Sequence, residues 1–137
     1  MSSTLENKRI LVVDDDQDII TTIQAVFEPT GAIIDVANNG NKAVELAEKN
    51  HPDLIILDMM LPGRSGFLVL EKVKARKPRN EKPFVIMITG NQGKRHQMYA
   101  ETLGANEYFT KPVKLDKLMA TAERLLAPPA AAAPPVA

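Results

Sequence analysis

Cysteine is absent from the 137-residue chain, and neither sign of charge is in excess. The lack of cysteine excludes disulfides and thiolate metal sites, and it permits a reducing compartment. Lysine plus arginine and aspartate plus glutamate number 17 each. A chain with this balance has no overall field that attracts nucleic acid or an anionic membrane, so we expect it to bind neither directly.

Long apolar runs are also missing. No stretch approaches the roughly 20 apolar residues that cross a bilayer, and the first eight residues lack the apolar core of a secretory signal. We therefore expect a cytoplasmic protein. The length suits one domain with its own hydrophobic core.

Five short β-prone runs alternate with helical patterns along the chain. The most apolar run, residues 54–58, ends in Asp58 and is typical of a strand buried on both faces. The other runs lie at residues 9–13, 32–37, 84–88 and 106–109. This alternation predicts a doubly wound α/β protein, with a five-stranded parallel sheet in the flavodoxin-like order 2-1-3-4-5 and five helices.

Apolar residues at helical spacing predict the helices, with Asp16 as N-cap of the first and Gly104 as the left-handed residue after the fourth. The third helix is expected to turn Phe67, Leu68, Leu70 and Val73 inward. The fourth, at residues 92–103, is the least apolar, with an expected inner face of Met98, Ala100 and Leu103. Because it is so lightly anchored, we expect this helix to move.

The last ten residues contain only Ala, Pro and Val. Such a segment cannot bury a core, so we predict a domain at residues 1–127 and a disordered tail or linker at residues 128–137. We expect no DNA-binding or enzymatic effector within the few residues that follow residue 126. We expect either a stand-alone domain or a part of a longer regulator.

Polar groups follow four of the five predicted strands. Asp14 and Asp15 follow the first strand, Asp58 the third, Thr89 the fourth and Lys111 the fifth. In the predicted order these strand ends meet at one edge of the sheet. Three carboxylates gathered there repel one another unless a cation lies among them, and a set of oxygen ligands favours Mg²⁺.

Asp15 and Asp58 are expected to bind Mg²⁺ directly, Asp14 through water and Met60 through its backbone carbonyl. An aspartate beside Mg²⁺, a lysine and a hydroxyl can attack phosphorus and form an acyl phosphate. Lys111 would then neutralise charge on the phosphoryl oxygens. Taken alone, an acidic run is usually a solvated loop, and a lysine before proline is usually a surface residue. The prediction therefore depends on the occurrence of these groups together, at four of the five strand ends.

These residues resemble the receiver domain of two-component response regulators, of the kind found in chemotaxis regulators. The resemblance covers residues 8–126, and its segments follow in the order and spacing of that family. They are residues 10–15, residues 52–58 with Leu61-Pro62-Gly63 and Gly66, residues 86–90, Gly104-Ala105 and Lys111-Pro112.

The resemblance implies a phosphorylation-activated switch with no separate substrate turnover. A sensor histidine kinase or a histidine phosphotransfer protein would phosphorylate Asp58. Thr89 would then turn toward the phosphoryl group and Tyr108 would follow it, while a cis peptide at Lys111-Pro112 aims the lysine.

Other positions of the family pattern concern the loops and the output. Met60 and Asn91 occupy positions that tune dephosphorylation in the family, and Ser65 stands where many relatives carry an acid. We expect the fourth helix, fifth strand and fifth helix to contact a downstream protein or, after phosphorylation, a second copy of the chain.

Two other functions stay open. Hydrolases that form an aspartyl phosphate usually need a second aspartate two residues beyond the nucleophile, and Met60 at that position argues against this class. An interaction module that works without phosphorylation is the other alternative, because a complete set of site residues does not prove their use.

Overall fold

The computed structural model describes residues 5–90 and 94–127. Its strands form a single parallel sheet in the order β2-β1-β3-β4-β5, as predicted. The predictions for the first residues, for Asn91 and for the tail at residues 128–137 lie outside the described residues. The strands are β1 (Arg9–Val13), β2 (Ile33–Ala37), β3 (Leu54–Asp58), β4 (Phe84–Thr89) and β5 (Glu107–Thr110).

Five α-helices alternate with these strands, and a short 3₁₀ turn, Glu28–Thr30, follows the first helix. The helices are α1 (Gln17–Phe27), α2 (Gly40–Asn50), α3 (Gly66–Val73), α4 (Lys94–Thr102) and α5 (Leu115–Leu126). The predicted caps are confirmed. The Asp16 side chain accepts a hydrogen bond from the Asp18 amide, and Gly104 follows α4 with φ of 108°.

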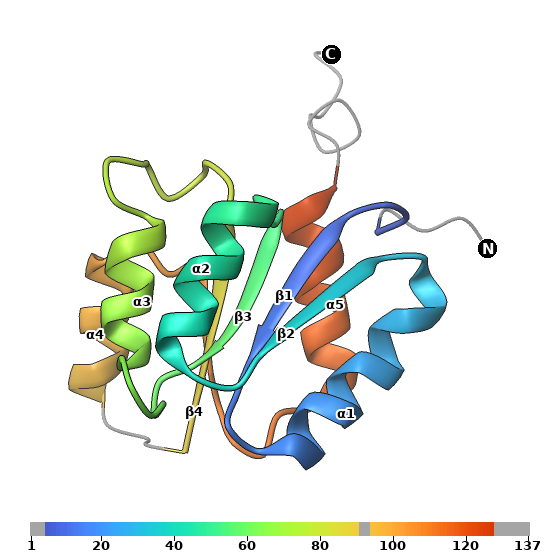
Figure 1. Ribbon diagram of the computed structural model, residues 1–137, viewed down its shortest axis with the longest axis horizontal. Coiled ribbons are helices and arrows are strands. Elements are labelled where there is room, and N and C mark those ends of the chain that lie inside the picture. Colours follow the sequence, from blue (N-terminus) through green and yellow to red (C-terminus); the bar gives the residue numbers. More distant parts are fainter. Residues whose placement is uncertain (1–4, 91–93, 128–137) are drawn as a thin grey trace, which may run out of the picture.

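Helices cover both faces of the sheet (Figure 1). Alternate strand residues point to opposite faces, so each strand contributes to two hydrophobic clusters. One cluster packs the sheet against α1 and α5, and the other packs it against α2, α3 and α4. All five residues of β3 are buried, as expected for the central strand of a parallel sheet.

The predicted inner faces of α3 and α4 are wrong at one residue each. Leu68 is 53% exposed, because α3 turns Val69, Leu70 and Val73 inward. Met98 is 61% exposed, and Ala100 is the buried residue of α4. A helix packed on a sheet buries a narrow stripe, and apolar residues one position away from it face solvent.

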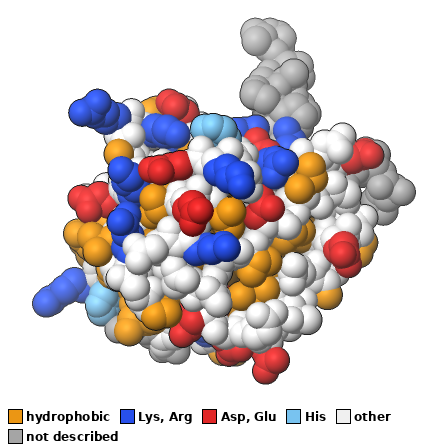
Figure 2. Space-filling model, viewed as in Figure 1, with side chains coloured by type: hydrophobic (Ala, Val, Ile, Leu, Met, Phe, Trp, Pro, Cys, Tyr) orange, Lys and Arg blue, Asp and Glu red, His pale blue; other side chains and the backbone are white. Residues whose placement is uncertain are grey.

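Among the described residues, none of the helices has the length and apolar character to cross a membrane. Figure 2 shows acidic and basic side chains interspersed over the face that carries α2. On this described face no large area of one sign stands out, which agrees with the balanced composition.

A buried lysine organises the loop between α3 and β4. The Lys74 ammonium donates to the carbonyls of Arg79, Glu81 and Pro83 at 3.2, 2.6 and 3.1 Å. Burial lowers the pKa of Lys74, but these three acceptors still suit a charged donor. The ammonium therefore holds the loop that leads into β4, the strand that ends in Thr89.

Replacing Lys74 with methionine tests this role. The variant retains an apolar stem up to Cε but removes the ammonium donor for three carbonyls, so we expect the free energy of unfolding to fall by about 1–3 kcal/mol in urea denaturation. Lys72→Met, near the end of α3 and two residues before Lys74, is the control, since Lys72 is exposed and its ion pair with Glu48 spans 3.8 Å. Equal losses in the two variants would contradict a special role for Lys74.

Candidate functional site

The sheet brings the predicted groups to one edge. In the parallel registers Val13 pairs with Leu57 and Asp58 pairs with Ile88, so β1, β3 and β4 end side by side. Thr89 pairs with Thr110 at the end of β5, next to Lys111. These carboxyl ends lie at the lower edge of the sheet in Figure 1.

Three carboxylates gather at this edge. Oxygen atoms of Asp14, Asp15 and Asp58 lie within 4.8 Å of one another. Asp14 and Asp58 are buried, whereas Asp15 is exposed on the solvent side. Asp14 also accepts a hydrogen bond of 2.9 Å from the Asp16 amide, which holds the turn that precedes α1. A hard divalent cation fits this all-oxygen set.

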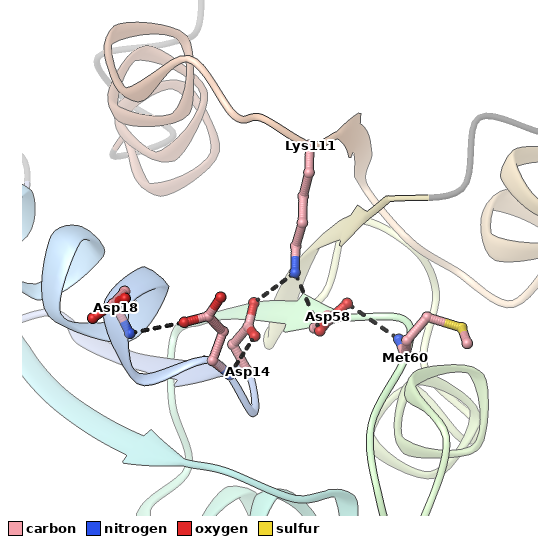
Figure 3. A network of polar contacts seen from close by, with 6 residues as sticks. Asp14, Asp18, Asp58, Met60 and Lys111 are labelled. Atoms are coloured by element: carbon pink, nitrogen blue, oxygen red, sulfur yellow. Dashed lines mark hydrogen bonds and ion pairs between the residues drawn. The ribbon is translucent and has the colours of Figure 1, made fainter.

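Lys111 reaches into the carboxylate cluster from the other side (Figure 3). Its ammonium lies 3.2 Å from Asp14 and 3.4 Å from Asp58. Two backbone features place this side chain. The Lys111 amide donates to the Thr89 carbonyl at 2.7 Å, and the Lys111–Pro112 peptide is cis, as the resemblance implied.

The charges within the cluster shift its pKa values in opposite directions. Burial raises the pKa of Asp58 to about 6, and Asp14 adds repulsion, while the Met60 amide and Lys111 oppose the shift. Burial alone would lower the pKa of Lys111, but Asp58 and Asp14 outweigh it and raise this pKa. The site thus carries an ammonium and a carboxylate that is ionised at some cost near neutral pH.

The loop after β3 shapes the surroundings of Asp58. The Met60 amide donates to Asp58 Oδ1 at 3.1 Å, while its side chain is 64% exposed. The Gly66 amide donates to the Met59 carbonyl at 2.9 Å and closes the loop. Ser65, at the position where relatives often have an acid, accepts from the Leu68 amide at 3.3 Å and caps α3.

Thr89 and Tyr108 interact beside the cluster. Thr89 is fully buried at the end of β4. Burial raises the pKa of Tyr108, and a side-chain hydrogen bond with Thr89 opposes this rise. The structure therefore brings together the two residues that the sequence analysis paired as a switch, and both lie on strands that lead into the segments at Gly90 and Lys111.

Two glycines at the site escaped the sequence analysis as positioning residues. A Cβ atom at Gly66 would lie 2.3 Å from the Asp58 carbonyl oxygen, and one at Gly40 would lie 2.0 Å from the Arg64 carbonyl oxygen. Both glycines start helices without needing a left-handed backbone. Most residue types can occupy the first position of a helix. A glycine there can therefore indicate that another segment packs too closely for a side chain.

Fold and site together define a flavodoxin-like α/β protein with an acidic cluster and a lysine at the carboxyl edge of its sheet. The family profile described as "Response regulator receiver domain" matches residues 10–123. The chain therefore belongs to the response regulator receiver domain family of two-component signalling.

Individual relatives agree with this assignment. The alkaline phosphatase synthesis transcriptional regulatory protein PhoP of Bacillus subtilis is 34% identical over 128 residues, which cover 93% of this chain and 52% of that protein. The chain spans about half the length of the curated relatives it matches.

Solved structures show the same fold. A CheY-like receiver domain protein from Methanospirillum hungatei superposes with a TM-score of 0.80 at 28% identity, covering 87% of this chain and 93% of that one. A response regulator from Burkholderia pseudomallei superposes with a TM-score of 0.74 at 25% identity, covering 82% of this chain and 65% of that one. Its crystal structure contains a phosphorylated aspartic acid, a calcium ion and citrate.

The raised pKa of Asp58 predicts how stability depends on pH in metal-free protein. In the folded state Asp58 ionises at about pH 6 rather than at its ordinary 3.8, so its charge destabilises the fold as pH rises through this window. Asp58→Asn lacks that charge. We expect the variant to be more stable than the wild type by about 1–3 kcal/mol above pH 6, and equally stable below pH 3.8, in urea denaturation with a chelator.

Asp53→Asn is the control of opposite sign. Although Asp53 is partly buried, Lys82 and the Arg9 amide hold its pKa below the ordinary value. Its ionised form therefore stabilises the fold above pH 3.8, and this contribution is lost as pH falls through the lowered pKa. We expect the Asn variant to be less stable than the wild type at neutral pH. A destabilised Asp58→Asn variant would contradict the account of the cluster.

Proposed function

We propose that this receiver domain is a phosphorylation-activated switch whose phosphoryl acceptor is Asp58. The observation that carries the proposal is the position of the Lys111 ammonium, which contacts two members of a three-carboxylate cluster within one edge of the sheet. A nucleophilic carboxylate, a lysine and a buried hydroxyl are the groups that phosphoryl transfer to an aspartate needs.

Asp14, Asp15, Asp58 and the Met60 backbone carbonyl are the proposed ligands of a Mg²⁺ ion. The donor set supports this, because it consists of oxygens and its carboxylates already lie within 4.8 Å of one another. When bound, Mg²⁺ would neutralise charge on the phosphoryl oxygens. The crystal structure of the Burkholderia pseudomallei relative contains a calcium ion as well as its phosphorylated aspartic acid and citrate, which supports the proposal that this chain binds a divalent cation.

In the proposed reaction a free Asp58 carboxylate oxygen attacks the phosphorus of a phosphohistidine. The new O–P bond forms as the P–N bond breaks, and the histidine leaves with the electron pair and takes up a proton. At pH values above about 6 Asp58 is ionised and nucleophilic. Lys111 lies where it can pair with a phosphoryl oxygen. Its ion pair with Asp58 is long, at 3.4 Å, so little is lost when the ammonium moves to the phosphoryl group.

The switch would then be read through Thr89 and Tyr108. A phosphoryl group adds roughly 1.5–2 negative charges and three strong acceptors. These acceptors favour a conformation in which the Thr89 hydroxyl turns to them and gives up its interaction with Tyr108. Because Ala100 is the one buried residue of α4, displacement of this helix would disrupt little packing.

A sensor histidine kinase or a histidine phosphotransfer protein is the proposed phosphoryl donor. The output would pass through a protein partner or a phosphorylation-linked second copy at the face formed by α4, β5 and α5. We propose no separate substrate turnover, no direct nucleic-acid or membrane binding by this chain, and a cytoplasmic location. The domain boundary at residue 127 and the tail or linker at residues 128–137 stay predictions.

Asp58→Asn tests the assignment of the acceptor. Incubated with acetyl phosphate and Mg²⁺, the wild type should gain the mass of one phosphoryl group in intact-protein mass spectrometry, and the variant should gain none. Asp53→Asn, a change of the same kind at the opposite end of β3, should still be labelled. Labelling of Asp58→Asn equal to that of the wild type would refute the assignment, and an unlabelled wild type would favour an interaction module that works without phosphorylation.

Thr89→Ala separates phosphorylation from its conformational effect. The chain has two tyrosines and no tryptophan, so in a Tyr99→Phe background fluorescence reports on Tyr108 alone. We expect beryllofluoride with Mg²⁺ to change this fluorescence in the background protein. Loss of one charge-assisted hydrogen bond, about 1.5–3 kcal/mol, should shift the switch roughly 10- to 150-fold toward the inactive state and reduce the change.

Thr110→Ala, at the paired position on β5, is the matched control. Its exposed side chain lies outside the proposed phosphoryl contacts, so the full response should remain. Labelling by acetyl phosphate should persist in both threonine variants. An undiminished response in Thr89→Ala would exclude the proposed coupling while leaving Asp58 as the acceptor.

A further inference from the structure

The N-terminus of α2 makes backbone contact with the loop that follows Asp58. Gly40 is the first residue of α2 and is buried. Its amide donates to the Pro62 carbonyl at 3.2 Å. One residue further along each chain segment, a Cβ atom on Gly63 would lie 3.3 Å from the Asn41 side-chain amide. The turn before α2 and the loop at residues 59–65 therefore touch at several points.

The contact at Gly40 has no space for a side chain. A Cβ atom there would lie 2.0 Å from the Arg64 carbonyl oxygen and 2.7 Å from the Arg64 carbonyl carbon. Both are backbone atoms, which no change of rotamer can remove. Any larger residue at position 40 must therefore push the loop away, push α2 away, or both.

Of the two, the loop is the easier to displace. α2 buries Ala43, Val44 and Ala47 in the cluster beneath it, so retreat of the helix would open the core. In the loop, Pro62 and Gly63 are exposed. A side chain at position 40 would therefore displace the loop at Arg64 and leave α2 in place.

The loop carries two groups of the proposed site. Met60 supplies an amide that donates to Asp58 Oδ1 at 3.1 Å, and its carbonyl is a proposed metal ligand. The hydrogen bond from the Gly66 amide to the Met59 carbonyl joins the two ends of the loop at residues 59–65. The loop therefore cannot adjust by unwinding the start of α3 without losing this hydrogen bond. A displacement at Arg64 is thereby passed to Met60 and to the Asp58 carboxylate.

We infer that Gly40 is a positioning residue of the phosphoacceptor site: through its backbone contact with Arg64, the start of α2 sets where Met60 and Asp58 present their oxygens to a divalent cation. This inference rests on the proposed function for its metal and phosphoryl chemistry. The contact itself lies within the fold and can be tested without either ligand.

Gly40→Ala is the test variant, measured first in metal-free protein by amide NMR. We expect chemical-shift changes at the amides of residues 58–66, away from the substitution in sequence. Titration with Mg²⁺ should then give an affinity about 10-fold weaker than that of the wild type, the usual effect of disturbing groups that orient metal ligands. The initial rate of labelling by acetyl phosphate should fall with the affinity.

Two further variants distinguish positioning from a general loss of stability. Leu126→Ala removes core packing at the far end of α5, so it should lower the melting temperature and leave the Mg²⁺ affinity unchanged. Arg64→Gly removes the Arg64 Cβ, 2.5 Å from the added methyl group, and frees the backbone to turn its carbonyl. Combined with Gly40→Ala it should restore part of the Mg²⁺ affinity, giving a non-additive double-mutant cycle.

The inference is overturned if Gly40→Ala changes only amides of α2 and binds Mg²⁺ as the wild type does, or if Leu126→Ala weakens Mg²⁺ binding as much as Gly40→Ala. Failure of the wild type to take up phosphate would refute the proposed function instead. The amide shifts of the metal-free variant would still decide whether Gly40 positions the loop.

Discussion

The ion pairs of one lysine with two buried aspartates are the interaction on which the functional edge of this domain depends. Asp14 follows the first strand, Asp58 ends the central strand and Lys111 follows the last, so the ammonium joins segments nearly 100 residues apart in sequence. Burial raises the pKa of Asp58 to about 6, and repulsion by the Asp14 carboxylate adds to the rise. The ammonium offsets part of that repulsion, and it leaves room for a second cation to offset the rest.

The same arrangement explains why a switch can be built at this edge. A site whose charges are balanced incompletely responds strongly to a further charged group, and in the proposed switch a phosphoryl group on Asp58 would add negative charge and acceptor oxygens facing Lys111 and Thr89. Thr89 is bonded through its backbone carbonyl to Lys111 and through its side chain to Tyr108. In the proposed switch, a change at Asp58 that moves Thr89 would thus reach both β4 and β5, the strands on either side of α4 in the sequence.

Much of this could be predicted from the sequence, because parallel sheets leave clear signals. Apolar runs that end in Asp14, Asp58 and Thr89 indicate buried strands that deliver polar groups to one edge, and the order of the strands follows from the alternation with helices. Leu68 and Met98 show where such reasoning fails. Both fit an apolar stripe, but which side of a helix faces the sheet depends on a rotation that neighbouring helices determine, so both are exposed.

Close backbone contacts were the other feature beyond reach of the sequence. An Asn-Gly pair before a helix indicates a turn, and this explanation of Gly40 is sufficient until the β3–α3 loop is seen against it. Lys74 is similar, since its position in the sequence suggests a surface lysine and its three carbonyl partners come from a loop without regular structure. Polar residues that converge on a strand edge can be found from topology alone. Gly40, which leaves no space for a side chain, and Lys74, which binds three carbonyls of one loop, can be recognised only from the distances between segments. Both contact loops that join the strands carrying the acidic cluster and Thr89.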